Sequence, residues 1–264
     1  MSNQLQLDLD LLLARSESWS LKINPGKCAA MRFGGKPNLS GMSCQKYSID
    51  GHAIDWAQSH RDLGVIVDCS LRFHSHVNMV AGKSSALSNQ LLRSTVCRDR
   101  DFMVSVFVAH IRPIIDYAST VWNVGYMGDV RKLERVQRRW TRETIGMTGL
   151  DYQDRLKDMG LFSIYGRLLR ADLIKIWKCF HSDVDVGLST LLEQQSHAAT
   201  RNHGFKLSIP RCRSEVRRRF WGVRGVSLWN SLPASIVQST SLETFKKRLD
   251  SHMEGEFYKT IDGL

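Results

Sequence analysis

The segment RKLERVQRRWTRE, residues 131 to 143, constrains the fold most, because its apolar and charged positions suit a helix with one buried face. Leu133, Val136 and Trp140 recur at helical spacing and predict the buried side. Basic residues follow the opposite side at intervals i, i+4, i+7 and i+11, namely Arg131, Arg135, Arg138 and Arg142. The pattern predicts an amphipathic helix over residues 129 to 145.

The first 75 residues predict a different kind of structure. A helical repeat over residues 5 to 19 ends at a Pro-Gly turn. Short strands are expected in CAAMRF, residues 28 to 33, and in LGVIVD, residues 63 to 68, with Gly64 inside the second strand. Between them, Asp50-Gly51 separates two alternating apolar runs, which favours a hairpin.

From residue 76 onward the pattern is helical. Residues 102 to 111 are apolar nearly all round, and their length favours a helix over a strand. Residues 162 to 180 have one apolar stripe at helical spacing. The polar, aperiodic stretch of residues 194 to 204 is a candidate linker, and Thr240 with Glu243 has the pattern of a capping box before a last helix. The predicted fold class is α+β, mostly α, in three regions: residues 1–75, 76–182 and 183–264.

The charge indicates a polyanionic partner. The chain has 264 residues and a net charge of +11, which favours nucleic acid first and an acidic membrane second. The six cysteines lack the spacing of a zinc site or a disulfide framework. We find no signal peptide, and the most apolar run, residues 102 to 115, is too short to cross a bilayer. We expect an intracellular chain, nuclear or cytoplasmic, without a membrane partner.

A second basic cluster, RCRSEVRRRFWGVR, spans residues 211 to 224 and contains Phe220 and Trp221. Arginine suits phosphates because its planar group donates two hydrogen bonds at once, and aromatic side chains stack on unpaired bases. The alternatives are a solvated face, ion pairs with the chain's own acids and, for both aromatic residues, core packing, which we favour. The candidate nucleic-acid-binding residues are Arg131, Arg135, Arg138, Arg139, Arg142, Arg217, Arg218 and Arg219.

Other short motifs carry little chemistry. AGKS, residues 81 to 84, resembles the end of a P-loop but has Val77 where the first glycine belongs. Asp8 and Asp10 point in different directions on a helix and cannot chelate together. The spacing of Cys69, His74 and His76 matches no common zinc pattern. We therefore predict no metal site and no cofactor in this chain.

The order of several longer motifs resembles the reverse transcriptases of non-LTR retrotransposons of the jockey-like or LINE-like kind. WSLKINPGKCAAMRF matches the family pattern W-x-L-x-x-N-x-x-K-C-x-x-M-x-F, and LGVIVDCSLRFHSH matches the pattern L-G-V-x-x-D-x-x-L-x-F-x-x-H. HIRPIIDYASTVWN, LERVQRRWTRETIG and SLWNSLPASIVQSTSLETFKKRL are similar to downstream parts of the family in the same order. The resemblance covers nearly the whole chain.

The resemblance implies a right-hand polymerase that binds an RNA or DNA template-primer. The three regions would then be the end of the palm, a helical thumb-like bundle, and a linker with a C-terminal helical extension. Lys27 would be the palm lysine that protonates the leaving pyrophosphate as a general acid. Leu63, Gly64 and Val65 would belong to the primer grip, although Asp62 stands where the family usually has an aromatic residue.

The catalytic carboxylates of that family are absent from this sequence. Polymerases hold Mg²⁺ with carboxylates, and the family's Tyr- or Phe-Ala-Asp-Asp box occurs nowhere here. We expect a fragment that polymerises nothing on its own, with the missing N-terminal polymerase portion as a candidate partner. The alternatives are a stand-alone basic nucleic-acid-binding remnant and a decayed transposon reading frame without function.

Overall fold

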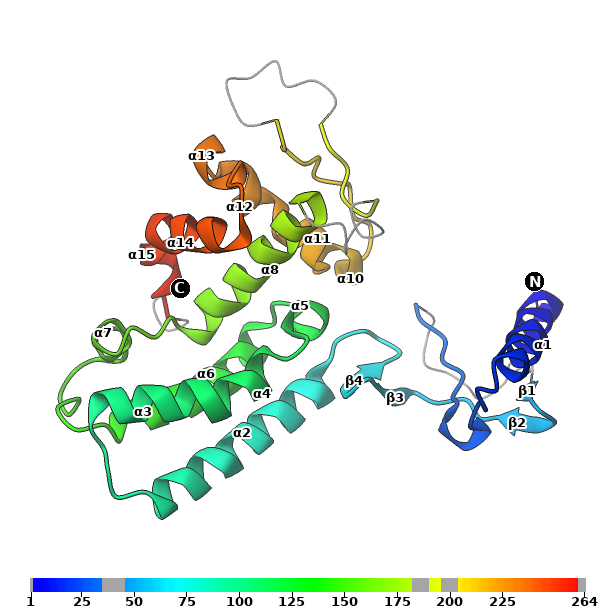
Figure 1. Cartoon of the computed structure of the whole chain (residues 1–264), viewed down its shortest axis with the longest axis horizontal. Helices are drawn as coiled ribbons and strands as arrows, with labels where there is room; N and C mark the ends of the chain where they lie inside the picture. The colour runs from blue at the N-terminus through cyan, green and yellow to red at the C-terminus, as the bar shows by residue number, and fades with distance from the viewer. Residues whose placement is uncertain (1, 35–45, 182–189, 196–203, 261–264) are drawn as a thin grey trace. The chain divides into compact units, whose positions relative to one another are not determined.

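The computed structural model describes residues 2–34, 46–181, 190–195 and 204–260. The chain divides into two compact units, Met1–Leu71 and Arg72–Leu264. Helices dominate, and the described strands form two separate two-stranded antiparallel sheets, as the predicted class of α+β, mostly α, requires (Figure 1). The predicted regions 76–182 and 183–264 both lie in the second unit.

The first unit begins with helix α1, Ser2–Ser18, followed by a short 3-10 turn, η1, at Pro25–Lys27. Strands β1, Tyr47–Ile49, and β2, His52–Ile54, form the expected hairpin. Both residues of its turn have left-handed backbone, with φ of 50° at Asp50 and 72° at Gly51, as Asp-Gly turns allow.

The prediction of a strand over residues 28 to 33 is wrong. Only Ala30 pairs there, in an isolated parallel bridge with Trp56. The amide of Ala30 donates to Asp55 O at 2.9 Å, and the amide of Ala57 donates to Ala30 O at 2.9 Å. The partner segment between β2 and the next strand is too short to extend this ladder.

A second hairpin joins β3, Ser59–Asp62, to β4, Val65–Asp68. The sequence placed Gly64 inside a strand, but Leu63 and Gly64 are the two-residue turn, with φ of 43° and 87°. A φ in this range breaks a strand ladder and suits a tight hairpin turn. The strand therefore begins at Val65, whose side chain is buried.

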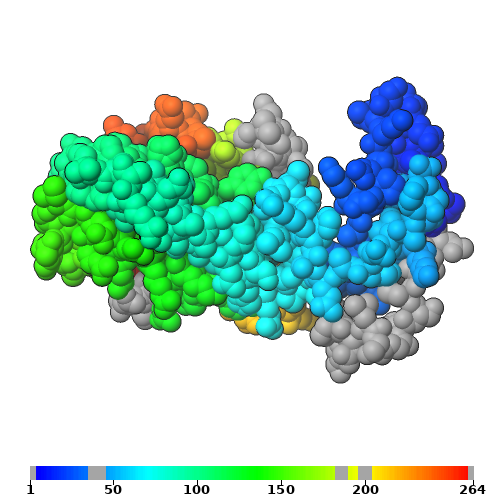
Figure 2. Space-filling view, turned by 90° about the horizontal axis from the view of Figure 1, so that it is seen from below, coloured from blue at the N-terminus to red at the C-terminus, as the bar shows by residue number. Residues whose placement is uncertain are grey.

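In the second unit, the long helix α2, His74–Ser94, packs against α6, Met127–Arg142. The apolar run after residue 100 is helical as predicted: α3, Arg100–Val106, continues through a π-helical segment, η2, Phe107–Ile111, into α4, Arg112–Asp116. The π segment precedes Pro113, which has no N–H for a helical hydrogen bond. Helices α5, Ser119–Trp122, and α7, Tyr152–Asp158, complete this bundle, whose surface is coloured teal to green in Figure 2.

Helix α8, Ile164–His181, is central to the C-terminal part of this unit. The predicted apolar stripe is confirmed, since Leu173, Ile176 and Trp177 are buried. The last helix begins one residue later than predicted, because Ser241, not Thr240, caps it by accepting from the amide of Thr244. Five further helices contribute residues to the core around α8: α11 (Trp221–Arg224), α12 (Val226–Ser231), α13 (Ala234–Val237), α14 (Leu242–His252) and α15 (Glu254–Phe257). The short helix α10, Glu215–Arg218, contacts α11.

Most of the candidate linker, residues 196 to 203, lies outside the described residues. Gln194 forms an isolated bridge with Leu207, so the chain on either side of this stretch is paired. Among the described helices, none combines enough length with enough apolar character to cross a membrane.

Candidate nucleic-acid interface

Helix α6 displays four of its five predicted arginines on its outer side. Leu133, Val136 and Trp140 face the core, and the Trp140 indole Nε1 donates to Met103 O at 2.9 Å. This packing fixes the rotation of the helix. Four arginines are exposed as a result, and we call them the arginine strip: Arg131, Arg135, Arg139 and Arg142.

The arginine strip has few acidic neighbours. Glu134 lies in the same stretch of sequence as these arginines, but its side chain is buried and faces the junction of α6, α7 and α8. It accepts hydrogen bonds from the Tyr152 hydroxyl and from the amides of Ile164, at 3.2 Å, and Tyr165, at 3.3 Å. Among the described residues, the only ion pair of the strip joins Arg142 to Glu143 at 3.9 Å, between two exposed side chains. The strip therefore presents nearly uncompensated positive charge.

Burial shifts the pKa of the Glu134 side chain. It raises the pKa of this carboxyl, while the hydrogen bond from Tyr152 and the two amides act in the opposite direction. The spacing in the sequence already indicated this burial. Glu134 lies four residues after Val130 and three before Gln137, so the three residues share one face of the helix. The side chains of Val130 and Gln137 are also buried.

Arg138 differs from the strip. Its guanidinium lies over the ring of Tyr152, with Cζ 4.7 Å from the ring centroid, and the side chain is half-buried. Arg155 lies 5.6 Å from the same ring. The expectation that Arg138 shares the exposed face is wrong, because this cation–π contact draws it inward.

The second basic cluster contains both solvent-facing and structural arginines. Arg217 and Arg218 are exposed, and Arg217 lies over Phe220 at 5.1 Å. Arg219 is half-buried and is held by other groups of the protein: its guanidinium donates to Glu215 Oε1 at 2.7 Å and to Val124 O at 2.9 Å. Its guanidinium also covers the ring of Tyr126 at 4.0 Å. The geometry thus separates Arg219 from the other two candidates.

The aromatic residues of this cluster belong to the fold. Trp221 is buried in the hydrophobic core around α8, and Phe220 packs partly buried against that core. The favoured alternative of core packing therefore describes Trp221, whose indole is not available for stacking on a base.

Lys27 and the hairpin tip are exposed features of the first unit. Lys27 ends η1, where the Asn24 side chain accepts from the Gly26 amide at 3.0 Å. Its side chain is exposed. At the tip of the second hairpin, Leu63 is 85% exposed while Val65 is 6% exposed, so the predicted primer-grip residues divide between solvent and core. Across the described ranges, no cluster of three or more His, Cys, Asp or Glu side chains could hold a metal ion.

The excess charge is confined to the second unit. Residues 1–71 have seven Lys or Arg and seven Asp or Glu, whereas residues 72–264 have 30 basic and 19 acidic residues, a difference of +11. Long-range attraction of a polyanion therefore acts on the helical unit that contains the arginine strip.

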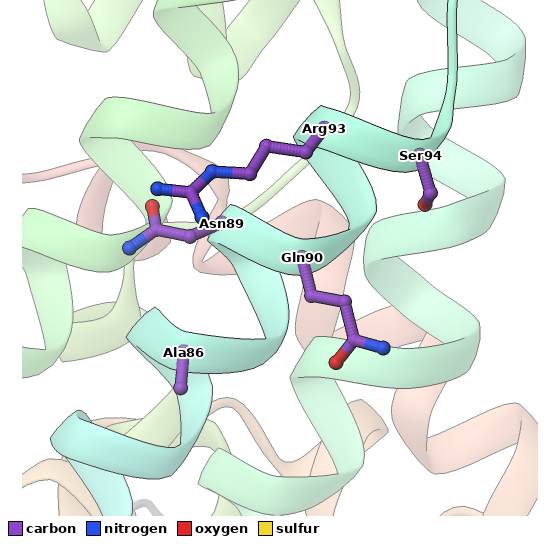
Figure 3. A pocket seen from close by; sticks show the side chains of 5 residues that line it. All are labelled: Ala86, Asn89, Gln90, Arg93 and Ser94. Carbon is purple, nitrogen blue, oxygen red and sulfur yellow. The ribbon is translucent and has the colours of Figure 1, made fainter.

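A hollow on α2 offers a weaker site. It measures about 600 Å³ and is lined by Ala86, Asn89, Gln90, Arg93 and Ser94, which all project from this one helix (Figure 3). A surface hollow with one charged group and no second wall of charged residues supplies little to position an anion.

Comparisons with known proteins point to mobile elements. No family model and no solved structure matches the chain. It is 24% identical over 222 residues to the RNA-directed DNA polymerase from mobile element jockey of Drosophila funebris, which is 83% of this chain and 22% of that protein. The corresponding jockey polymerase of Drosophila melanogaster is 26% identical over 150 residues, 54% of this chain and 15% of that protein.

A third relative, an uncharacterized protein of Caenorhabditis elegans, is 23% identical over 124 residues, 46% of this chain and 61% of that protein. The chain spans less than a quarter of the length of either jockey polymerase. It is therefore related in sequence, over part of their length, to the RNA-directed DNA polymerases of the mobile element jockey.

Proposed function

We propose that this chain is a C-terminal part of a non-LTR retrotransposon reverse transcriptase, and that it binds template-primer nucleic acid through the arginine strip without polymerising by itself. The observation that carries the proposal is the strip: Arg131, Arg135, Arg139 and Arg142 are exposed together, and Glu134 is turned away from them. The similarity to jockey polymerases supports the same partner.

The strip suits a phosphate backbone better than base edges. Its four guanidinium groups repeat along about three turns of one helix, so several phosphates of one strand can be contacted in succession. Phosphate contacts position a protein without reading sequence. We therefore expect binding to RNA and DNA with little dependence on base order.

The proposal extends to the intact polymerase. Lys27 would act there as the general acid for the leaving pyrophosphate, which its exposure at the end of η1 allows. Leu63, Gly64 and Val65 would form part of the primer grip, and the exposed Leu63 is the side chain able to contact a primer. Mg²⁺ and the catalytic carboxylates would come from the missing portion.

The test compares the wild-type chain with a variant in which the four strip arginines are replaced by Gln. Fluorescence anisotropy with a labelled RNA–DNA primer-template, measured from 50 to 300 mM salt, should give a log–log slope near −5 if about six phosphates are contacted. The variant should lose about 3 to 4 units of that slope. A slope of log affinity against log salt near zero for the wild type would contradict the proposal.

A matched control carries the same change of charge. Lys22, Lys83, Lys157 and Lys247 are exposed and lie outside the strip, so replacing all four by Gln should leave most of the affinity and slope intact. Equal losses in the two variants would mean that net charge, and not the strip, drives binding. A primer-extension assay with Mg²⁺ should give no product, and extension by the chain alone would contradict the proposed inactivity.

A further inference from the structure

A basic cavity lies in the second unit, away from the residues of the arginine strip. It measures about 340 Å³ and is bounded by the end of α4 and the residues after it, by α5, by α8 and by α14. Its charged lining consists of five cations and one carboxylate: Arg167, Arg170, Lys175, Lys178, Lys246 and Asp116. This volume is at the lower end of the range of small-molecule sites.

Helix α8 supplies most of these cations because of its rotation. Arg167, Arg170 and Lys178 are at positions i, i+3 and i+11, which fall on one face of a helix. The core packing of Leu173 and Trp177 turns that face toward the cavity. The apolar stripe of residues 162 to 180 predicted the helix but not this basic face, although the spacing of its basic residues was already visible in the sequence.

Two carboxylates hold the guanidinium groups in place. Asp116 accepts from Nε of Arg167 at 3.3 Å and from its Nη2, and Asp250 accepts from Nε and Nη2 of Arg170 at 2.5 and 2.9 Å. These side-on pairs use Nε and Nη2, and no hydrogen bond to another described residue uses Nη1 of either arginine. The Nη1 hydrogens are therefore the ones that a further acceptor would use. The side chains of Arg167 and Arg170 are only 18% and 20% exposed, which limits their freedom to move.

Two further cations of the lining add positive charge to the cavity. Lys178 and Lys246 form no ion pair there with any described carboxylate. Burial together with repulsion from Arg167 lowers the pKa of Arg112 to about 10, whereas Asp116 acts in the opposite direction. A bound anion would relieve this concentration of positive charge.

We propose that this cavity binds a phosphate group, supplied either by a nucleic-acid backbone or by a free polyphosphate. The arginine hydrogens would give directed bonds to phosphate oxygens, and Lys178 and Lys246 add positive charge to the lining. The inference goes beyond the proposed function, because none of the strip arginines lines the cavity and the cavity does not need the strip to bind.

The experiment uses the full chain and a double variant, Lys178→Gln with Lys246→Gln. The control is Lys83→Gln with Lys247→Gln, which removes the same charge at exposed positions outside the cavity. Circular dichroism melts verify that all three proteins are folded. Isothermal titration with sodium tripolyphosphate should show binding to the wild type and the control, and affinity about tenfold weaker in the cavity variant.

A second arm replaces tripolyphosphate by a labelled 20-nucleotide RNA. If the backbone is the natural source of the phosphate, the cavity variant loses about 2 units of log–log salt slope relative to the control. If only the tripolyphosphate arm responds, a free polyphosphate is the ligand, and the proposal stands with that source. The proposal is overturned if the wild type binds neither probe, or if the cavity variant binds both as tightly as the control.

The two proposals fail separately. The strip variant could lose RNA binding while the cavity variant behaves like its control with both tripolyphosphate and RNA. That result would contradict only the proposed phosphate site in the cavity. The wild type could instead fail to bind RNA but bind tripolyphosphate in a way that depends on Lys178 and Lys246. That result would contradict only the proposed function.

Discussion

The guanidinium of Arg224 holds both carboxylate oxygens of Asp172, with Nε–Oδ2 and Nη2–Oδ1 distances of 2.7 Å each. The Asp172 side chain is 3% exposed, so this ion pair lies inside the protein, between α11 and α8. Burial raises the pKa of Asp172, and Arg224 opposes that effect. One arginine of the second basic cluster is therefore part of the fold, while Arg217 and Arg218 face solvent.

Replacing Arg224 by Gln should lower the free energy of unfolding by about 3–5 kcal/mol, because Asp172 would keep a buried charge without its partner. Urea denaturation followed by tryptophan fluorescence measures the change. Arg218→Gln, at an exposed position of the same cluster, should stay within about 0.5 kcal/mol of the wild type. Equal midpoints for the two variants would contradict the structural role of Arg224.

Replacing Gly166 by Ala should destabilise the protein although alanine favours helices. A Cβ at this position of α8 would lie 2.2 Å from Phe257 O, a backbone atom held by hydrogen bonds from Ser163. We expect a loss of about 1–3 kcal/mol by urea denaturation. Gly82→Ala is the control, since Gly82 is an exposed position within α2 with open space around it, and it should gain about 0.5–1 kcal/mol.

Glu134 should give the protein a specific pH dependence. Its pKa is raised in the folded state, so the folded protein holds this proton more tightly than the unfolded chain does. The corresponding stability is present below the ordinary glutamate pKa of 4.5 and is lost as the pH rises through the raised value. We therefore compare the free energies of unfolding of the wild type and of Glu134→Gln. The value for the wild type minus the value for the variant should fall as the pH rises, by about 1.4 kcal/mol for each pH unit by which folding raises the pKa of Glu134.

Urea titrations of both proteins from pH 4 to pH 8 measure this difference. Glu143→Gln provides the control, because it removes the same charge at an exposed position next to the end of α6. A difference between wild type and Glu134→Gln that stays constant, or that rises with pH, would contradict the burial of this carboxyl.

Arg138 and Arg135 should respond in opposite ways to replacement by Ala. Arg138 lies over the Tyr152 ring, so its loss should cost about 0.5–2 kcal/mol of stability by the cation–π contact and by packing. Arg135 is exposed in the strip, so its loss should leave stability unchanged and weaken nucleic-acid binding. Parallel melts and anisotropy titrations of the two variants separate the roles, and identical effects in both assays would contradict the assignment.

Local sequence patterns predicted the structure correctly where the conformation depends on the residues of one segment alone. The Asp50-Gly51 hairpin follows from residues that tolerate left-handed backbone, and α6 follows from the spacing of Leu133, Val136 and Trp140. The strand over residues 28 to 33 failed because a strand needs a partner, and the partner is short. Gly64 was misplaced because a glycine within an apolar run suits both a strand and a turn.

The sequence by itself determined the helical class of the chain, its excess of basic residues and its likeness to a family of polymerases, since periodicity, charge and motif order are all properties of the linear chain. Only the tertiary structure decided which charges are available. It turned Glu134 inward, drew Arg138 over Tyr152, buried Arg224 against Asp172, and brought Lys246 beside the basic face of α8. The physical reason is that a charge binds a partner only where packing leaves it exposed and unpaired, and packing joins residues far apart in sequence.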